Sequence, residues 1–96
     1  MDKKIYMNSL YDYYGDLLTD KQKEYFEEYY FKDLSLGEIA DNKGVSRNAV
    51  YNQIKSAEEK LEFYENTLNL YSKSLKIKKL ISDLDCELVS KIEELI

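Results

Sequence analysis

Apolar residues recur along this chain at intervals of three and four, the spacing of one face of a helix. With no proline and only three glycines among 96 residues, little in the sequence interrupts long helices. The pattern therefore predicts an all-α fold. The apolar faces of the first two expected helices are Ile5, Leu10, Tyr13 or Tyr14 and Leu17 in one, and Tyr25, Phe26, Tyr29 and Tyr30 in the other.

Polar residues mark where three helices begin. In "LTDKQ", Thr19 can cap the N–H of Gln22, whose side chain can reach back to Thr19, and this reciprocal pair is a capping box. Ser35 and Glu38 repeat the arrangement in "LSLGEI". Ser46 in "VSRNAV" can cap a further helix. We therefore expect helices to begin near Ile5, Asp20, Leu36 and Arg47.

Residues 35–54 have the spacing of a helix-turn-helix. Ala40 keeps a small side chain where two helices would cross, and Gly44 can adopt the left-handed conformation that ends a helix. Lys43 departs from the usual apolar residue at its position, and its aliphatic stem could cover the core while the ammonium reaches water. The residues expected to face inward after the turn are Val45, Val50 and Ile54.

A coiled-coil-like stripe continues beyond this motif. It consists of Ile54, Ala57, Leu61, Tyr64, Leu68, Tyr71 and Leu75, in alternating steps of three and four. A second stripe follows in a different phase and consists of Ile77, Leu80, Ile81, Leu84, Leu88, Ile92 and Leu95. The change of phase between residues 72 and 77 predicts a kink or a turn between two long C-terminal helices.

These elements predict one domain over residues 1–96, with a helix-turn-helix core at 5–70 and a helical extension at 71–96. A helix from Arg47 to about Leu75 would be about 43 Å long. A compact chain of this size has a radius of gyration of only about 12 to 13 Å, so such a helix could not bury its whole stripe in one globule. We therefore expect a homodimer through the stripe that begins at Ile54, unless a turn folds the C-terminal part back onto the same chain.

Composition narrows the class of protein. No segment approaches the roughly 18 uncharged apolar residues of a membrane span, and the start "MDKKIYMNSLYDYY" lacks the apolar run of a signal peptide. We expect a soluble, cytoplasmic protein. Ten tyrosines could form a surface that stacks on bases, but their helical spacing, with few basic residues between them, favours packing in the core and at interfaces.

The sequence offers little for catalysis or metal binding. The absence of histidine removes the commonest general base and the usual zinc ligand sets. The single Cys86 lies between Leu84 and Leu88 and is expected to be a small packing residue. The acidic pairs at 27–28, 58–59 and 93–94 are expected to be solvated, because adjacent helical residues point in different directions. No catalytic residue, cofactor or metal site is expected.

The formal net charge of −5 is distributed unevenly. Residues 1–42 carry five lysines and ten acidic residues, whereas residues 43–60 carry four basic and two acidic residues. Residues 61–96 carry five lysines and seven acidic residues, and four of those lysines lie within "KSLKIKK". The expected helix-turn-helix is the only one of these three parts with a net positive charge.

The stretches "LYDYYGDLLTDKQKEYFEEYYFKDLSLGEIA" and "VSRNAVYNQIKSAEEKLEFYE" resemble the YlxM family, bacterial helix-turn-helix proteins linked to the signal recognition particle. More distantly, "LSLGEIADNKGVSRNAVYNQI" is similar to the fourth region of primary-type sigma factors, which reads a promoter element through its second motif helix. The resemblance covers about Leu10 to Leu70. It implies an all-α fold and a regulatory role, connected through gene neighbourhood with the particle's GTPase and its receptor.

The sigma-like resemblance implies which residues face nucleic acid. The sequence departs from sigma factors where they become strongly basic, because "KSAEEKLEFYE" supplies Glu58, Glu59, Glu62 and Glu65. Arg47 and Lys55 could contact phosphates, while asparagine and tyrosine side chains could reach base edges. The outward positions of the expected recognition helix are Ser46, Arg47, Asn48, Tyr51, Asn52 and Lys55.

Two functions from different classes remain open. The first is a non-enzymatic regulator that binds nucleic acid, either duplex DNA or the particle's RNA. The second is an adaptor in which the motif is only a scaffold and the aromatic and lysine-bearing helices bind a protein partner, most plausibly the particle's GTPase.

Overall fold

The computed structural model describes residues 2–96, and within them every regular element is helical. The elements are α1 (Lys3–Tyr14), the short 3-10 helix η1 (Gly15–Leu17), α2 (Asp20–Tyr30), α3 (Leu36–Lys43), α4 (Arg47–Leu68), α5 (Leu70–Leu80) and α6 (Cys86–Glu93). The all-α prediction is confirmed. Both capping boxes are present, and the Ser46 hydroxyl oxygen accepts the Ala49 N–H at 3.0 Å.

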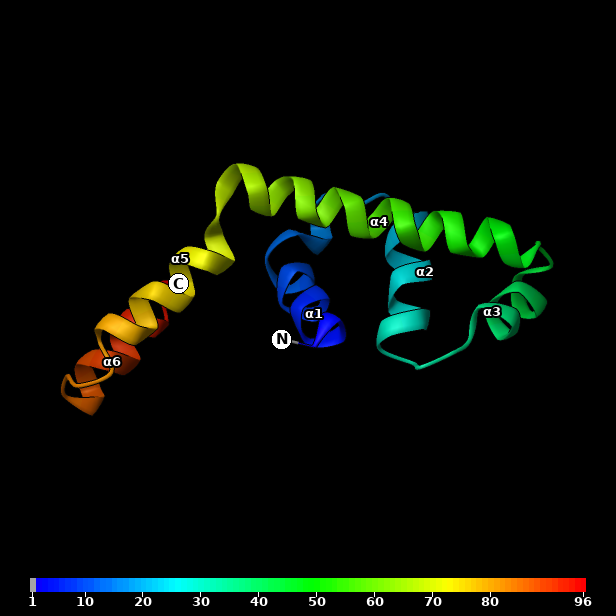
Figure 1. Ribbon diagram of the computed structural model, residues 1–96. Coiled ribbons are helices and arrows are strands. Elements are labelled where there is room, and N and C mark those ends of the chain that lie inside the picture. The colour runs from blue at the N-terminus through cyan, green and yellow to red at the C-terminus, as the bar shows by residue number, and fades with distance from the viewer. Residues whose placement is uncertain (1) are drawn as a thin grey trace.

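Helix α4 is the long central helix against which the shorter helices pack. Figure 1 shows α1, α2 and α3 on one side of it, while α5 and α6 leave from its C-terminal end. Side chains from the three shorter helices meet the inner face of α4 and make one core. The residues with no exposed surface in this core include Leu10, Phe26, Ile39, Val50, Ala57 and Leu61.

The turn between α3 and α4 has the geometry that the sequence predicts. Gly44 adopts φ +66°, and its N–H bonds to the carbonyl of Ala40, which is buried. Val45, expected to face inward, is instead 39% exposed, because the chain is still turning at this residue and has not yet entered α4. Val50 and Ile54 are buried as expected.

The ammonium group of Lys43 contacts side chains of α2, in addition to any cover that its aliphatic stem gives the core. Its ammonium forms ion pairs with Glu24 and with Glu28, the latter at 3.1 Å, and it lies 5.2 Å from the centre of the Tyr25 ring. These contacts tie the end of α3 to α2. The positive charge of Lys43 is therefore balanced by the carboxylates of Glu24 and Glu28.

Helix α4 ends at Leu68, earlier than the stripe of apolar residues predicts. Asn69 adopts φ 57° and forms the single-residue joint to α5. The expected kink between residues 72 and 77 is therefore wrong, since those residues lie inside α5. The buried Glu65 carboxylate accepts the N–H groups of Tyr71 and Ser72, at 3.1 and 3.0 Å, so it caps the new helix from the preceding one.

Because α4 ends at Leu68, the apolar stripe that begins at Ile54 does not form one continuous helical face. Ile54, Ala57 and Leu61 are buried by α1, α2 and α3 of the same chain, whereas Leu68 is 43% exposed. The N-terminal half of the stripe is therefore core and does not need a partner chain. The resulting shape is elongated, with a radius of gyration of 16.4 Å and extents of 53 × 25 × 23 Å.

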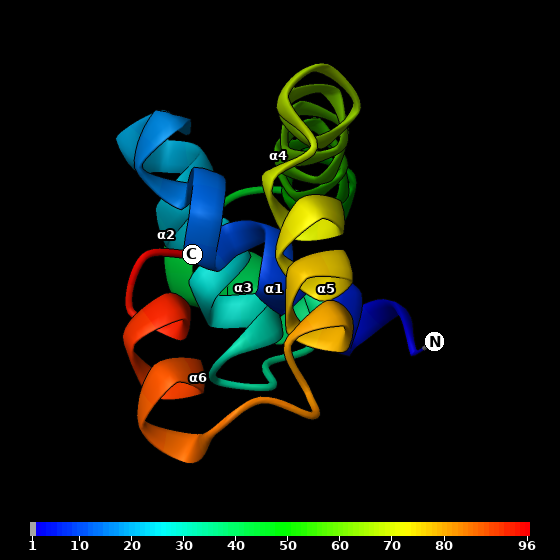
Figure 2. The ribbon, with the colours of Figure 1, turned by 90° about the vertical axis from the view of Figure 1, so that its left-hand side faces the viewer.

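Helices α5 and α6 form a hairpin. Figure 2 shows α6 returning beside α5 after the turn that follows residue 80. Ile81 is buried, but Leu84 and Leu88 are each 45% exposed, and no residue of α6 is buried. Cys86 is also exposed, so its prediction as a packing residue is wrong in this chain. The second stripe is thus split over two short helices and remains half open.

The apolar face predicted for the first helix differs from the buried face of α1 at two positions. Ile5 and Leu17 are 58% and 48% exposed, while Met7 is buried in their place. The reason at Leu17 is that η1 turns the chain before that residue. On α2, Tyr25, Phe26 and Tyr30 are buried as predicted, and Tyr29 lies at the edge of the core.

Candidate nucleic-acid interface

The first half of α4 carries the predicted interface. This part of α4 lies at the end of the molecule that α3 and the turn between the two helices also form (Figure 1). All six residues that the sigma-like resemblance implies are exposed: Ser46, Arg47, Asn48, Tyr51, Asn52 and Lys55.

Arg47 and Lys55 carry the positive charge of this surface. The ion pairs formed within residues 2–96 involve neither side chain, so both charges face solvent. The Lys55 ammonium lies 5.7 Å from the centre of the Tyr51 ring, one helical turn away. Leu36, Arg47, Asn48 and Tyr51 line a shallow hollow of about 430 Å³. A cation beside an exposed aromatic ring can contact both a phosphate and the face of a base or sugar.

Ser46 has a structural role at the start of this surface. Because its hydroxyl oxygen caps the Ala49 N–H, it fixes where α4 begins and hence which way Arg47 and Asn48 point. The positive end of the helix dipole lies at the same place, and it favours an anionic group there.

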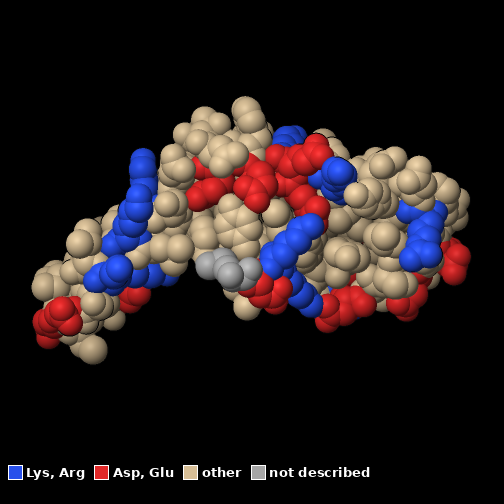
Figure 3. Space-filling model, in the orientation of Figure 1, with Lys and Arg blue, Asp and Glu red and all other residues tan. Residues whose placement is uncertain are grey.

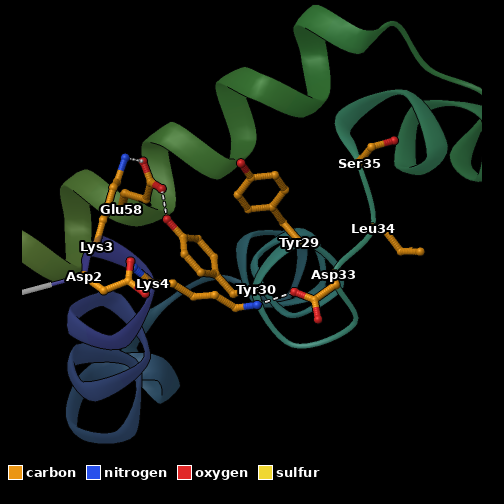
Figure 4. A pocket seen from close by; sticks show the side chains of 9 residues that line it. All are labelled: Asp2, Lys3, Lys4, Tyr29, Tyr30, Asp33, Leu34, Ser35 and Glu58. Atoms are coloured by element: carbon orange, nitrogen blue, oxygen red, sulfur yellow. Dashed lines mark hydrogen bonds and ion pairs between the residues drawn. The ribbon is translucent and has the colours of Figure 1, made fainter.

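Glu58, one turn beyond Lys55, is not a free acidic residue. Its carboxylate accepts a hydrogen bond from the Tyr30 hydroxyl and lies 3.5 Å from the Lys3 ammonium (Figure 4). Burial and this hydrogen bond raise the pKa of Tyr30 well above its usual value. The prediction that the acidic pairs are merely solvated is therefore wrong for Glu58. It is also wrong for Glu27, which accepts from Tyr11, and for Glu28, which pairs with Lys43.

A groove of about 500 Å³ lies beside Glu58, between the start of α1 and the turn from α2 to α3 (Figure 4). Lys4 crosses this groove and forms an ion pair with Asp33, which has φ 54°. Since Lys3 pairs with Glu58, both lysines of the groove are occupied by carboxylates of the chain. The groove therefore offers no unpaired cation to an anionic ligand. Its lining is Asp2, Lys3, Lys4, Tyr29, Tyr30, Asp33, Leu34, Ser35 and Glu58.

The charge on this face of the molecule alternates. Acidic side chains gather over the middle of α4, and basic side chains gather over α5 (Figure 3). Glu59 is exposed, and Glu62 is partly buried and accepts the Tyr6 hydroxyl at 3.1 Å. A polyanion at the start of α4 would therefore end against an acidic surface about three turns further along the helix.

Sequence reasoning missed the structural role of Glu65, which caps the start of α5. The side chain is 6% exposed, and Tyr14 donates its hydroxyl proton to Glu65 Oε1 at 2.6 Å. The Tyr14 oxygen in turn accepts the Leu70 N–H at 3.0 Å. One signal was present: Glu65 follows the buried Leu61 by four residues and so lies on the buried face of α4.

Within residues 2–96, no cluster of three or more acidic, cysteine or histidine side chains is arranged to hold a metal ion. No helix in the same range is long and apolar enough to cross a membrane. The start of α4 exposes two cations that no ion pair within residues 2–96 involves, two amides and a phenol.

Comparison with known proteins gives the family of this fold and surface. The family model described as "Putative helix-turn-helix protein, YlxM / p13 like" (UPF0122) matches residues 1–95. The chain belongs to this family. The sequence-based resemblance to YlxM proteins is thereby confirmed, and the UPF0122 description names a helix-turn-helix and no enzymatic activity.

Relatives in the UPF0122 family align over most of the chain. The UPF0122 protein of Caldanaerobacter subterraneus subsp. tengcongensis is 49% identical over 83 residues, which is 86% of this chain and 71% of that protein. The UPF0122 protein of Listeria welshimeri is 48% identical over 90 residues, which is 94% of this chain and 82% of that protein. The UPF0122 protein of Geobacillus sp. is 47% identical over 94 residues, which is 98% of this chain and 86% of that protein.

Proposed function

We propose that this protein is a nucleic-acid-binding regulator that uses the start of α4 as its recognition surface. The observation that supports this most is the pair of cations Arg47 and Lys55, exposed on one helix and without carboxylate partners, while Lys43 beside them is neutralised. In this proposal Arg47 and Lys55 contact phosphates, and Asn48, Tyr51 and Asn52 reach bases. Ser46 holds the start of the helix.

Two nucleic acids are candidates for the target. The sigma-like motif supports duplex DNA, because a helix entering the major groove can read base edges. The YlxM resemblance supports the RNA of the signal recognition particle. Each subunit places few cations, so binding by one chain should be modest and strongly salt-dependent. A homodimer would double the contacts. Since the first half of the stripe is buried in its own chain, that dimer would use other surfaces, among them the exposed side chains of α5.

The alternative function is an adaptor that binds the particle's GTPase. The half-exposed Leu84 and Leu88 of the α5–α6 hairpin favour it, since a protein partner could cover them. In that case changes at Arg47 and Lys55 would leave complex formation unaffected.

Fluorescence anisotropy with a labelled DNA duplex and labelled particle RNA, over a salt series, tests the proposal. Arg47→Ala and Lys55→Ala should each weaken binding and reduce the salt slope by about 0.9 for a lost duplex phosphate contact. Lys32→Ala is the matched control, because Lys32 is exposed on the α2–α3 turn away from the motif. Its slope should not change.

Removing nearby negative charge should have the opposite effect. Glu59→Gln should tighten binding at low salt, because Glu59 lies one turn from Lys55 and within about a Debye length of its phosphate. Glu58→Gln is unsuitable for this purpose, since Glu58 holds Tyr30 and Lys3. Absence of binding to either nucleic acid at about 50 mM salt, by a folded protein, would contradict the proposal and favour the adaptor.

A further inference from the structure

Helix α5 carries the strongest local charge in the chain. Its eleven residues include Lys73, Lys76, Lys78 and Lys79 and no acidic residue. All four lysines are exposed, and none takes part in an ion pair within residues 2–96. By contrast, the cations that contact the body of the molecule, such as Lys3 and Lys43, are paired. Helix α5 is therefore a basic surface without its counter-charge.

The counter-charge lies on α4 of the same molecule. A shallow groove of about 490 Å³ lies beside α4. Its acidic lining is Glu58, Glu59 and Glu62; Lys3, which pairs with Glu58, and Lys55 also line it, together with Met7, Asn66 and Phe63, which is 63% exposed. The groove runs from Lys55 to Asn66 and so follows α4 for about 16 Å, which is also about the length of α5. The two surfaces match in length and are opposite in charge. Both also present apolar side chains, because Leu80 on α5 is 81% exposed.

Both surfaces face the same way. In Figure 3 the acidic middle of α4 and the basic α5 appear side by side on one face. A face with a negative patch beside a positive patch is self-complementary about a two-fold axis that passes between the patches. One such rotation places each α5 on the α4 groove of the other chain and makes both contacts at once.

The α5–α6 hairpin also lacks enough core of its own. Within the described chain, no residue of α6 is buried, and a helix of eight residues is only marginally stable in water without packing. Leu84 and Leu88 are almost half exposed, and Leu95 is 84% exposed. A partner that covers α5 would extend the apolar contact onto this hairpin and stabilise it.

We propose that α5 of one chain docks in the acidic groove beside α4 of a second copy, forming a two-fold homodimer in which α5 lysines pair with Glu59 and Glu62. This inference rests on the homodimer proposed above and not on nucleic-acid binding. It replaces the contact through Ile54 with a contact between different faces. It also covers the acidic middle of α4 and leaves Arg47 free in both subunits, while Lys55 lies at one end of the occupied groove.

Charge reversal and rescue test this interface. Sedimentation equilibrium of the full chain should give twice the 11.4 kDa monomer mass, with a dissociation constant that rises with salt. Lys76→Glu with Lys79→Glu should raise that constant by more than about tenfold, and so should Glu59→Lys. Combining the three changes should restore part of the affinity, because the ion pair at residue 59 is re-formed with its sign reversed. Leu80→Ser should weaken the dimer without changing its salt dependence.

Two controls separate the interface from folding and from the homodimer itself. Asp41→Lys changes an exposed carboxylate on α3, away from the groove, and should leave the dimer unchanged. Circular dichroism should show the same helicity for every variant. A dimer that neither reversal weakens, or that the combined variant fails to restore, would overturn this interface while the homodimer stands. A wild-type chain that stays monomeric at about 100 μM would overturn both.

Discussion

Glu65 shows how a charged side chain can be buried in so small a core. An isolated carboxylate would be costly there, but this one accepts hydrogen bonds from the Tyr14 hydroxyl and from two backbone N–H groups at the start of α5. The positive end of the α5 dipole also favours a negative charge at this point. The side chain of Asn69 makes no cap, so Glu65 performs that function from the end of the preceding helix.

Removing the charge of Glu65 should therefore destabilise the fold. Glu65→Gln places an amide NH₂ among three donors, and we expect unfolding free energy to fall by about 1 to 3 kcal/mol, measured by urea titration of the helical signal. Tyr14→Phe should also destabilise, because it leaves the Leu70 N–H without its acceptor. Asp41→Asn, at an exposed position on α3 away from the groove, should change stability by less than about 0.5 kcal/mol. Equal stability of Glu65→Gln and the parent would show that the cap has no energetic role.

The two glycines of the motif offer a test of helix α3 and its end. Gly44 has φ +66°, so Gly44→Ala should cost about 1 to 2 kcal/mol even though an added Cβ would meet no atom within 4 Å. Gly37 lies inside α3, where an added Cβ would make only an ordinary contact with Ser35. Gly37→Ala should therefore stabilise by about 0.5 to 1 kcal/mol. Thermal melts of the two variants should shift in opposite directions, and a shift in the same direction would refute this account.

The helix starts could be predicted because their signals are local. Thr19, Ser35 and Ser46 each cap a backbone N–H three residues later, and Gly44 ends α3 in the only conformation that suits the turn. The end of α4 could not be predicted in this way. It depends on Tyr14, which is 51 residues from Glu65 in the sequence and meets it only after folding.

The exposure of the candidate surface also followed from local spacing, whereas its electrostatics did not. Lys55 faces outward because it lies on a different side of α4 from Val50 and Ile54, whereas Arg47 is exposed as the first residue of that helix. Whether a nearby charge is free depends on other elements: Lys43 is neutralised by α2, and Glu58 is held by Tyr30 and by α1. Counting charges along the sequence could not distinguish these cases.

Four tyrosine–glutamate hydrogen bonds connect the helices of the body. They join α1 to α2 and α4, and α2 to α4, through hydroxyls that donate to carboxylates: Tyr6–Glu62, Tyr11–Glu27, Tyr14–Glu65 and Tyr30–Glu58. In each case burial is the main reason that the tyrosine pKa is raised, and the hydrogen bond to the carboxylate adds to it. The folded protein therefore holds these four protons more tightly than the unfolded chain does.

This difference predicts a loss of stability at alkaline pH. The pKa of Tyr6 is raised from 10.0 to about 12, so its contribution is complete below pH 10 and disappears as pH rises toward 12. The other three tyrosines act in the same direction. Urea midpoints measured from pH 8 to 12 should fall above about pH 10, and Tyr6→Phe should make that fall shallower. A midpoint that is constant over this range would contradict the tyrosine–glutamate contacts.

The joint at Asn69 has a consequence for hydrogen–deuterium exchange. Amides in the first turn of a helix usually exchange quickly, because no carbonyl of the helix accepts them. In α5 the N–H groups of Leu70, Tyr71 and Ser72 are held by side chains from α1 and α4. Their exchange therefore reports on Tyr14 and Glu65, and all three amides should lose protection together whenever α5 separates from the body.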